Sequence, residues 1–346
     1  MTTEQSRPRP KEPNRLARFI PLLQWAPSYE RQWLRPDLIA GLTVTALVVP
    51  KALGYAGIAG VPIQYGLYAA AAGAILYALF GTSRQISTGP SSALAAVAAS
   101  AVLVAGMSSD QDAVALVAAI TLVTGILFLL LALFKMGWFS QFLSKAVITG
   151  FLFGAAIEVV IGELPKITGT SIEGSNSWQK LAGWLQGLPD TDGTTLLVGL
   201  ISLALIFGLR RVAPRVPGAL VLVVVGLVAS AALGLGERGL ALIGDVPSGL
   251  PSLALPNLGF VMSNLAVIVS AAVGLLLIGF SQSAGDARAF AAKHKYRVNI
   301  NQESVAQGIS NIGSGLVQGI PVSTSLSASS LNDTSGAKTP VASLTT

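Results

Sequence analysis

The chain has no cysteine and a single histidine, His294, among its 346 residues. Without thiols it cannot form disulfides, iron–sulfur clusters or thiolate zinc sites, and one imidazole cannot build a histidine metal site. The sequence also contains neither a Ser/His/Asp set nor a phosphate-binding glycine loop. These absences argue against metalloenzymes, redox proteins and nucleotide hydrolases, so we expect no enzymatic activity, no metal and no cofactor.

Charge is scarce as well. Charged residues make up 11% of the chain and hydrophobic residues 52%, whereas a soluble domain carries about 25% charged residues. Apolar runs of about 20 residues can cross ~30 Å of hydrocarbon. Several such runs predict an all-α polytopic membrane protein: Leu38–Gly57, Gly66–Phe80, Ala113–Phe134, Ala146–Val160, Thr194–Leu209, Ala219–Leu235 and Leu258–Phe280. The amphipathic, glycine-rich stretch Gln302–Gln318 predicts one more helix.

Basic residues fall in every second connection between the apolar runs, and acidic residues fall in the others. The basic connections contain Arg7 to Arg35, Arg84, Lys135 and Lys145, Arg210 to Arg215, and Lys293 to Arg297; the acidic ones contain Asp110, Asp112, Glu163, Glu173, Asp190, Asp192, Glu237 and Asp245. The positive-inside rule then predicts a cytoplasmic N-terminal segment, residues 1–37, on a bacterial inner membrane. The longest connection, Leu164–Gly193, is expected outside. Because topology explains the net charge of +6, no nucleic-acid partner is expected.

Two apolar segments are interrupted in the same way. Arg84–Ser92 leads into an alanine-rich stretch, and Gly319–Ser327 leads into another stretch of small residues. Each pattern predicts a few extended residues followed by a helix too short to cross the bilayer, at 89–105 and 324–336. Paired segments of this kind indicate the midplane site of a transporter. Since a helix N-terminus favours negative charge, the expected ligand is an anion.

The expected anion site is built on these two helix starts. Gly89 lets the backbone approach a ligand closely, and proline at position 90 suits a first helical turn. Hydroxyl and backbone groups of Ser91 and Ser92, and of the second start, would supply donors: Ser325, Leu326 and Ser327. The alternative is that these serines only cap the helices and bond to their own backbone.

Lys51 lies about 14 residues inside its apolar run, or ~20 Å into the bilayer at 1.5 Å per residue. An intramembrane lysine predicts a functional site, although pairing with a buried carboxylate for structure alone is the alternative. Pro50 frees a carbonyl on the preceding turn, which could accept a bond from the ammonium. Tyr55 lies one turn further on the same face, either as a wall of the site or as packing.

Gln282 and Asp286 lie one turn apart, so their side chains share a helix face and extend the expected site. Asp286 is predicted to be the counter-ion of Lys51 or a coupling group; the alternative places it near the cytoplasmic end beside Arg288. Glu158 lies within the run at 146–160, where an interhelical structural role is expected.

Many ordered motifs resemble the SulP sulfate-permease family of anion transporters, which includes the animal anion exchangers and prestin. They extend from about Arg31 to the last residue and include Asp37-Leu-Ile-Ala-Gly-Leu-Thr-Val, Gly54-Tyr55-Ala56, Phe80-Gly-Thr-Ser-Arg84, Ser87-Thr-Gly-Pro90, Lys293-His-Lys-Tyr296 and Gly336-Ala-Lys338-Thr339. The resemblance implies a seven-plus-seven inverted-repeat fold that is C-terminally incomplete here, because further membrane segments and a cytoplasmic STAS domain would follow. It assigns residues 38–140 and 258–346 to a core domain and 141–257 to a gate domain.

The resemblance implies a secondary active transporter in which the core moves against the gate like an elevator, as a homodimer when full-length. The expected substrate is a small anion such as sulfate, bicarbonate, chloride or a dicarboxylate. Family members often carry arginine where this chain has Ala328, and many carry glutamine at position 51, so Lys51 would replace the missing cation. Two alternatives stay open: a proton-coupled nucleobase or dicarboxylate carrier of the same fold, and a non-transporting scaffold or decayed carrier.

Overall fold

The computed structural model describes residues 20–107, 109–137, 153, 157, 160–161, 163–170, 177–213, 218–237, 239–240, 242 and 251–346. The predicted span Ala146–Val160, with Glu158, therefore lies almost entirely outside the described residues. The same holds for residues 1–19 of the expected cytoplasmic segment.

Four described helices are long and apolar enough to cross a membrane. They are α3 (Leu34–Ile58), α6 (Asp110–Leu133), α9 (Gly193–Val212) and α12 (Leu265–His294). Shorter helices are α4 (Gln64–Phe80), α5 (Ser92–Val104), α10 (Gly218–Leu233) and α13 (Ile300–Leu316). The prediction of an all-α polytopic protein is confirmed, and α13 confirms the expected helix at 302–318.

Smaller elements complete the described chain. At the N-terminal end they are α2 (Leu22–Trp25), η1 (Ala26–Ser28) and η2 (Arg31–Trp33). Further along they are α8 (Ser177–Gln186), η4 (Leu188–Asp190), α11 (Leu258–Ser263), α14 (Leu326–Thr334) and α15 (Val341–Leu344). The connection expected at 164–193 thus contains a helix, α8.

The predicted boundaries of the span Leu258–Phe280 are wrong. The helix breaks at Asn264, whose side-chain amide donates to the Phe260 carbonyl at 3.0 Å, and α12 then continues to His294. The extension beyond Phe280 is rich in alanine and buries a face that includes Ser283, Ala287 and Phe290. Lys295 ends it in the left-handed conformation, with φ 56°. The length of the apolar run did not predict the part of α12 beyond Phe280, because that part is amphipathic and carries polar residues on one face.

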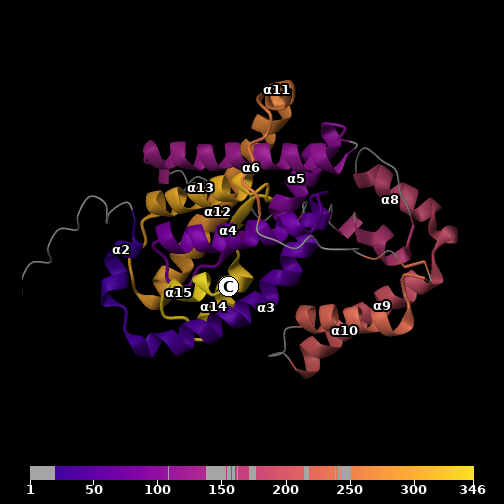
Figure 1. The fold of residues 1–346 in the computed structure, drawn as a ribbon, viewed down its shortest axis with the longest axis horizontal. Coiled ribbons are helices and arrows are strands. Elements are labelled where there is room, and N and C mark those ends of the chain that lie inside the picture. Colours follow the sequence, from indigo (N-terminus) through magenta and orange to yellow (C-terminus); the bar gives the residue numbers. More distant parts are fainter. Residues whose placement is uncertain are drawn as a thin grey trace, which may run out of the picture.

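Helix α13 lies at the centre of the fold, packed mainly on α6 and α4 (Figure 1). It meets α6 where Gly125 faces Gly308. A Cβ atom on Gly125 would lie 2.7 Å from the Gly308 carbonyl oxygen, and one on Gly308 would lie 3.0 Å from that of Gly125. Small residues permit this close approach of two helix backbones.

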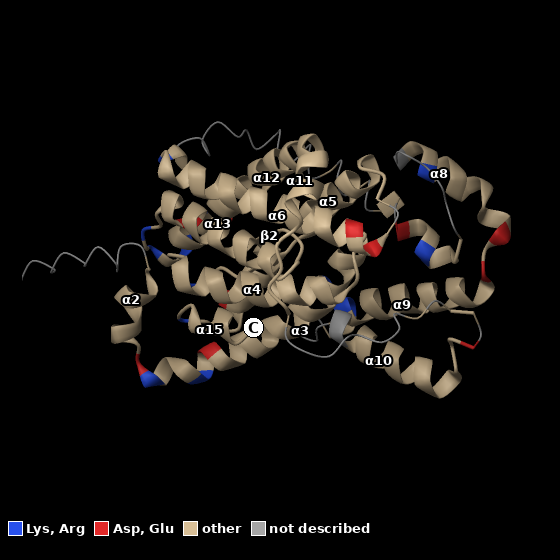
Figure 2. Cartoon of the chain, turned by 45° about the horizontal axis from the view of Figure 1, so that its top comes forward, with Lys and Arg blue, Asp and Glu red and all other residues tan. Residues whose placement is uncertain are grey.

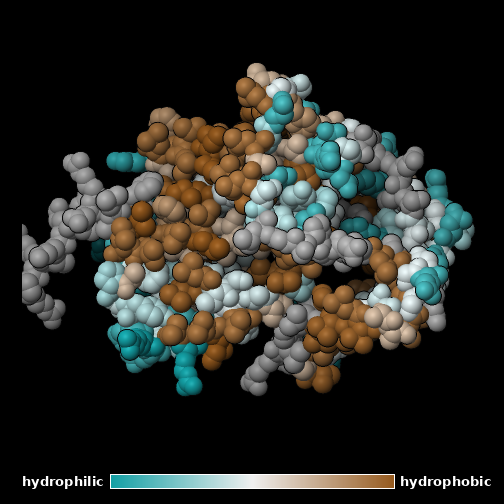
Figure 3. Space-filling model, in the orientation of Figure 1, coloured by the Kyte–Doolittle hydropathy of each residue, from teal (hydrophilic) through white to brown (hydrophobic). Residues whose placement is uncertain are grey.

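The outer surface and the charge distribution agree with a membrane protein. Apolar surface covers much of α6 and the α9–α10 pair (Figure 3), where large side chains such as Leu133, Leu197 and Leu227 are exposed. Basic residues gather around the end of the molecule near α2, whereas acidic residues lie around α8 at the far end together with some basic ones (Figure 2).

Two short strands bring distant parts of the sequence together. β1 (Thr88–Pro90) pairs antiparallel with β2 (Val322–Thr324), with Gly89 opposite Ser323. The half-helices are α5 and α14, so the starts expected at 89 and 324 were each set too early. Gly89, Pro90 and Thr324 belong to the strands, because their backbones are extended and pair across the sheet.

Candidate functional site

Each strand leads directly into a serine-capped helix. Ser91 is extended (φ −131°, ψ 148°), and its Oγ accepts from the Leu94 N–H at 3.4 Å. Ser325 is also extended (φ −115°, ψ 106°), and its Oγ accepts from the Ala328 N–H at 3.4 Å. Both serines therefore cap their helices, as the alternative in the sequence analysis allowed. The remaining first-turn amides have no partner within their own helix.

The polar face of α13 holds the two strands in place. Asn311 donates through Nδ2 to the Val322 carbonyl at 2.9 Å and accepts the Val322 N–H through Oδ1 at 3.0 Å. Gln307 donates to Thr88 Oγ1 at 3.1 Å, and Ser314 donates to the Ile320 carbonyl at 2.7 Å. These α13 side chains are fully buried. The amphipathic pattern of the sequence thus reflects support for the strands rather than a water-facing side.

The two half-helices are also joined directly. The Ser325 N–H donates to the Ser87 carbonyl at 3.0 Å, and the Ser87 N–H donates to Ser329 Oγ at 3.0 Å. Asn332 Nδ2 donates to the Gln85 carbonyl at 3.1 Å. These bonds fix the start of α14 against the loop that precedes β1.

A cavity of about 690 Å³ lies where the two helices begin. Among the predicted site residues, those that line it are Lys51, Tyr55, Ser91, Ser92, Gln282, Asp286, Ser325, Leu326 and Ser327. Gly89 does not line it but borders a smaller space that it shares with Lys51 and Pro90. Ser281 and Gly285 also line the cavity and were not predicted, although they lie beside Gln282 and Asp286 on the same helix; their spacing of four residues could have indicated a shared helix face.

Lys51 reaches across the cavity to the start of α14. Its Nζ donates to Ser327 Oγ at 2.6 Å, and Ser327 Oγ lies 3.3 Å from Ser325 Oγ. The ammonium is thus bound by a hydroxyl, and neither the carbonyl freed by Pro50 nor a carboxylate holds it in this structure. One cation therefore stands at the N-terminus of a half-helix.

Asp286 faces the same cavity from α12. Its Oδ2 accepts from Thr324 Oγ1 at 2.8 Å, and no ion pair joins it to Lys51. Gln282, one turn earlier, has a buried Oε1 without a hydrogen-bond partner among the described residues. On the opposite wall the Ser92 side chain interacts with the Tyr55 hydroxyl.

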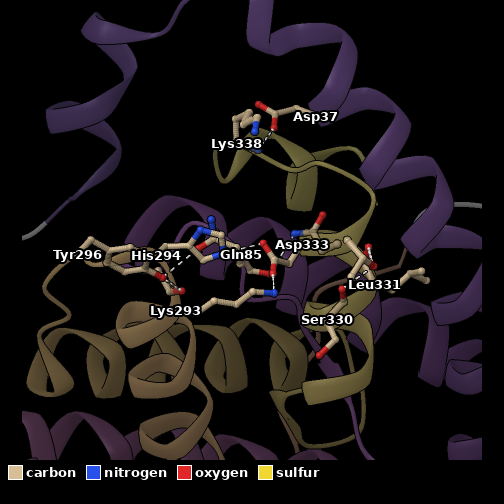
Figure 4. Close-up of polar contacts among 12 residues, drawn as sticks. Asp37, Gln85, Lys293, His294, Tyr296, Ser330, Leu331, Asp333 and Lys338 are labelled. Carbon is tan, nitrogen blue, oxygen red and sulfur yellow. Dashed lines mark hydrogen bonds and ion pairs between the residues drawn. The ribbon is translucent and has the colours of Figure 1, made fainter.

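The far end of α14 is clamped to α12 and α3 (Figure 4). Asp333 binds Lys293 Nζ at 2.6 Å and His294 Nε2 at 2.8 Å. Asp37 accepts from the Lys338 N–H at 2.6 Å and from Thr339 Oγ1 at 2.6 Å. These contacts make α3, α12 and α14 one supported unit around the cavity. His294 therefore has a structural role, as a partner of Asp333.

Tyr296 connects this clamp to the loop before β1. Its hydroxyl lies 2.7 Å from Ser83 Oγ and donates to Gln85 Oε1 at 3.0 Å. Burial raises the pKa of the Tyr296 phenol. The neutral phenol therefore persists at physiological pH and keeps its hydrogen-bond donor.

The sulfate permease family matches residues 34–346. The chain belongs to this family. A probable sulfate transporter of Mycobacterium tuberculosis is 37% identical over 327 residues, covering 92% of this chain and 58% of that protein. A sodium-independent sulfate anion transporter of Bos taurus is 29% identical over 363 residues, covering 96% of this chain and 59% of that protein. The chain thus spans a little under three fifths of the length of these two relatives.

Two solved transporter structures share the fold. The transmembrane domain of a cyanobacterium bicarbonate transporter, BicA, matches with a TM-score of 0.78 at 26% identity, covering 92% of this chain and 81% of that one. The murine Solute Carrier 26 family member A9 anion transporter in the inward-facing state matches with a TM-score of 0.86 at 22% identity, covering 99% and 60%. The latter similarity concerns the fold alone.

Proposed function

We propose that these residues form the anion-binding part of a secondary active transporter, with the anion held between the starts of α5 and α14. The observation that carries the proposal is the convergence of two helix N-termini and the Lys51 ammonium on one cavity. Free first-turn amides, serine hydroxyls and an ammonium are all donors to negative charge. Acceptors are fewer on this wall, and Asp286 is already bonded to Thr324.

The Lys51 ammonium can contribute substantially to the free energy of anion binding. A unit charge about 4 Å from an anion, at an effective dielectric near 20, contributes about 4 kcal/mol before desolvation is subtracted. Loss of water from both ions reduces the net value. Lys51 thereby replaces the arginine that family members often carry at the position of Ala328.

The substrate proposed is a small inorganic or carboxylate anion: sulfate, bicarbonate, chloride or a dicarboxylate. The relatives support this class, since their names specify sulfate and bicarbonate transport. A nucleobase is disfavoured, because Tyr55 is the only aromatic side chain that lines the cavity among the described residues. The proposal includes a bacterial inner membrane as the location, a cytoplasmic N-terminus, and a homodimer when the protein is full-length.

The proposed mechanism is an elevator movement of core against gate. Within the described chain, α10 packs on α9 and on α3, and α9 has no buried residue. The cavity is lined by α3, α5, α12 and α14 and the segments just before them, without α9 or α10. This separation supports a core that moves as one body past the gate.

Uptake by the full-length protein in proteoliposomes tests the function. We expect labelled sulfate, bicarbonate, chloride or a dicarboxylate to accumulate or exchange above empty vesicles, and unlabelled substrate to compete. Thermal unfolding of the purified protein with the same anions measures binding independently. A protein that neither moves nor binds any of them is a scaffold, and the proposal is then wrong.

A further inference from the structure

A second cavity, of about 380 Å³, lies at the end of the molecule where α3 begins and α12 ends, and it shares no residue with the first. Four segments of the chain converge on it, and its wall comprises Pro21, Gln24, Trp25, Ser28, Trp33, Gly81, Thr82, Arg84, Arg297, Asn299, Thr339 and Pro340. By the charge alternation, this is the end that we predict to face the cytoplasm.

The wall carries two cations and no carboxylate. Arg84 and Arg297 line the cavity, and neither forms an ion pair with a described residue. Arg84 is exposed, and its guanidinium carbon lies 5.9 Å from the centre of the Tyr296 ring. Stacking of this kind orients a guanidinium while its N–H groups stay available.

Two buried acidic residues, Asp37 and Glu303, lie next to the wall and accept hydrogen bonds from wall residues. Asp37, fully buried, accepts from the Thr339 N–H at 3.1 Å and from Thr339 Oγ1. Glu303, 1% exposed, accepts from the Thr82 N–H at 2.8 Å and from the Tyr77 hydroxyl. Their oxygens therefore stiffen the wall but do not face the cavity, whose accessible charge stays positive.

Asn299, the N-cap of the 17-residue helix α13, adds a helix start to the same wall. The positive end of the α13 dipole therefore points toward the cavity. Trp25 and Trp33 provide an apolar side, and Tyr29 packs between them with ring centroids 6.4 and 6.0 Å away. Tryptophan and tyrosine gather at membrane–water interfaces, where lipid headgroups lie.

We propose that this cavity binds a phosphoryl group, carried by an anionic phospholipid or by a free phosphate compound. A guanidinium group can bind two phosphate oxygens at once, which a single halide or a neutral headgroup does not exploit, and two arginines line this cavity. Residues 1–19 of this chain do not suit the site, because their charged positions are mainly basic: Arg7, Arg9, Lys11, Arg15 and Arg18 outnumber Glu4 and Glu12.

The ligand would contact both loops that carry the half-helices. Gly81–Arg84 leads into β1, and Thr339 and Pro340 follow α14. A ligand bound in the second cavity would hold these two loops together without contacting the residues of the anion cavity. The inference does not depend on the proposed transport activity.

The test uses the full-length protein in a mild neutral detergent and four variants: Arg84→Gln, Arg297→Gln, the double change, and the control Lys295→Gln. Lys295 is an exposed neighbouring cation that does not line the cavity. Thermal unfolding is followed against short-chain phosphatidylglycerol, short-chain phosphatidylcholine and inorganic phosphate. Each arginine change is expected to weaken binding about tenfold, as for loss of one charge-assisted hydrogen bond.

We expect phosphatidylglycerol to raise the unfolding temperature of the parent and of Lys295→Gln, and the double variant to lose this shift. An equal shift with inorganic phosphate would identify a free phosphate compound as the ligand. Phosphatidylcholine acting as strongly as phosphatidylglycerol, or an undiminished shift in the double variant, would overturn the proposal.

If the glutamine variants do not fold, the double change Arg84→Lys and Arg297→Lys keeps both charges and should still lose the affinity that bidentate hydrogen bonds provide. Lys51→Gln should leave this binding unchanged, so failure here is separable from failure of the anion site.

Discussion

Lys51 and Asp286 face one cavity, yet each is held by a hydroxyl from the strand–helix segment Thr324–Ser327 rather than by the other. The lysine donates to Ser327 at 2.6 Å, and the aspartate accepts from Thr324 at 2.8 Å. A lysine ammonium has three donors, so bonding to Ser327 leaves two for an incoming anion. Because Lys51 is bonded to a neutral hydroxyl, an incoming anion does not have to displace a carboxylate from the ammonium.

Lys51→Gln in the full-length protein should weaken anion binding by one or two factors of ten, at about 1.4 kcal/mol for each factor. The physical reason is loss of the only cation among the residues that line the cavity. Titration calorimetry or uptake at graded anion concentrations measures it, with Lys295→Gln as the matched control. Unchanged affinity in Lys51→Gln would show that the lysine is structural.

Gln282 has a buried acceptor without a partner in the described chain, one turn from Asp286. Replacing it by glutamate in the Lys51→Gln background should create dependence of uptake on Na⁺ or pH that the parent lacks. The added carboxylate would need a cation or proton once the ammonium is gone. Uptake at varied Na⁺ and pH measures this, and the same substitution beside an intact Lys51 is the control. A flat response in the double variant would show that a carboxylate at position 282 couples neither Na⁺ nor protons to uptake.

At the scale of elements, the site depends on a helix that does not line it. α13 holds both strands through buried side chains and crosses α6 where two glycine backbones meet. Most of the short elements around the cavity lack the length to be stable alone. The geometry of these elements therefore depends on α13, and substitutions that disturb α13 should also disturb the anion cavity.

Asn311→Leu should lower the free energy of unfolding by about 1–3 kcal/mol for each Val322 backbone group left buried without a partner. Asn311 is fully buried and binds both the N–H and the carbonyl of Val322. Chemical denaturation in detergent measures the loss. Ser310→Ala is the control on the same helix, since Ser310 makes one long bond of 3.4 Å to the Gly73 carbonyl. Equal stability of the two variants would contradict the supporting role of Asn311.

Gly125→Ala should destabilise the protein by about 1–3 kcal/mol, because the added methyl group overpacks the α6–α13 crossing. Its Cβ would lie 2.7 Å from a backbone oxygen of Gly308, which cannot rotate away. Gly274→Ala on α12 is the matched control, with nothing within 4 Å of the added carbon. Thermal unfolding of both variants compares them, and a Gly125→Ala protein as stable as the control would mean that the helices can separate without cost.

At the scale of the whole molecule, the α9–α10 pair contacts α3 through α10, whereas the segments around the half-helices are tied to α3, α12 and α13 by polar bonds. A body held together in this way moves as a unit more readily than it deforms, because packed cores are not continuously deformable. This arrangement is consistent with the proposed elevator movement, in which the core would be displaced as a unit.

The absence of cysteine from the chain allows a direct test of that movement. A single Ser330→Cys, at an exposed position that lines the cavity, should react with membrane-impermeant maleimide from either side of the vesicle. Saturating anion should change the two rates, because the core changes position when loaded. Ser270→Cys, exposed on α12 away from the cavity, should not respond to the anion. Reaction from one side only, under all conditions, would exclude alternating access.

The sequence by itself predicted most of the long apolar helices, the two interrupted segments and nine of the residues that line the cavity. Apolar run length, helix-start residues and an intramembrane lysine are local signals, and each retains its meaning without knowledge of the fold. Only the tertiary structure decided the pairing of β1 with β2, the extension of α12 to His294, and the partners of Lys51 and Asp286. The Lys51–Ser327 bond joins residues 276 positions apart, so helix packing selects the hydroxyl over the carbonyl or carboxylate that the local sequence equally allowed.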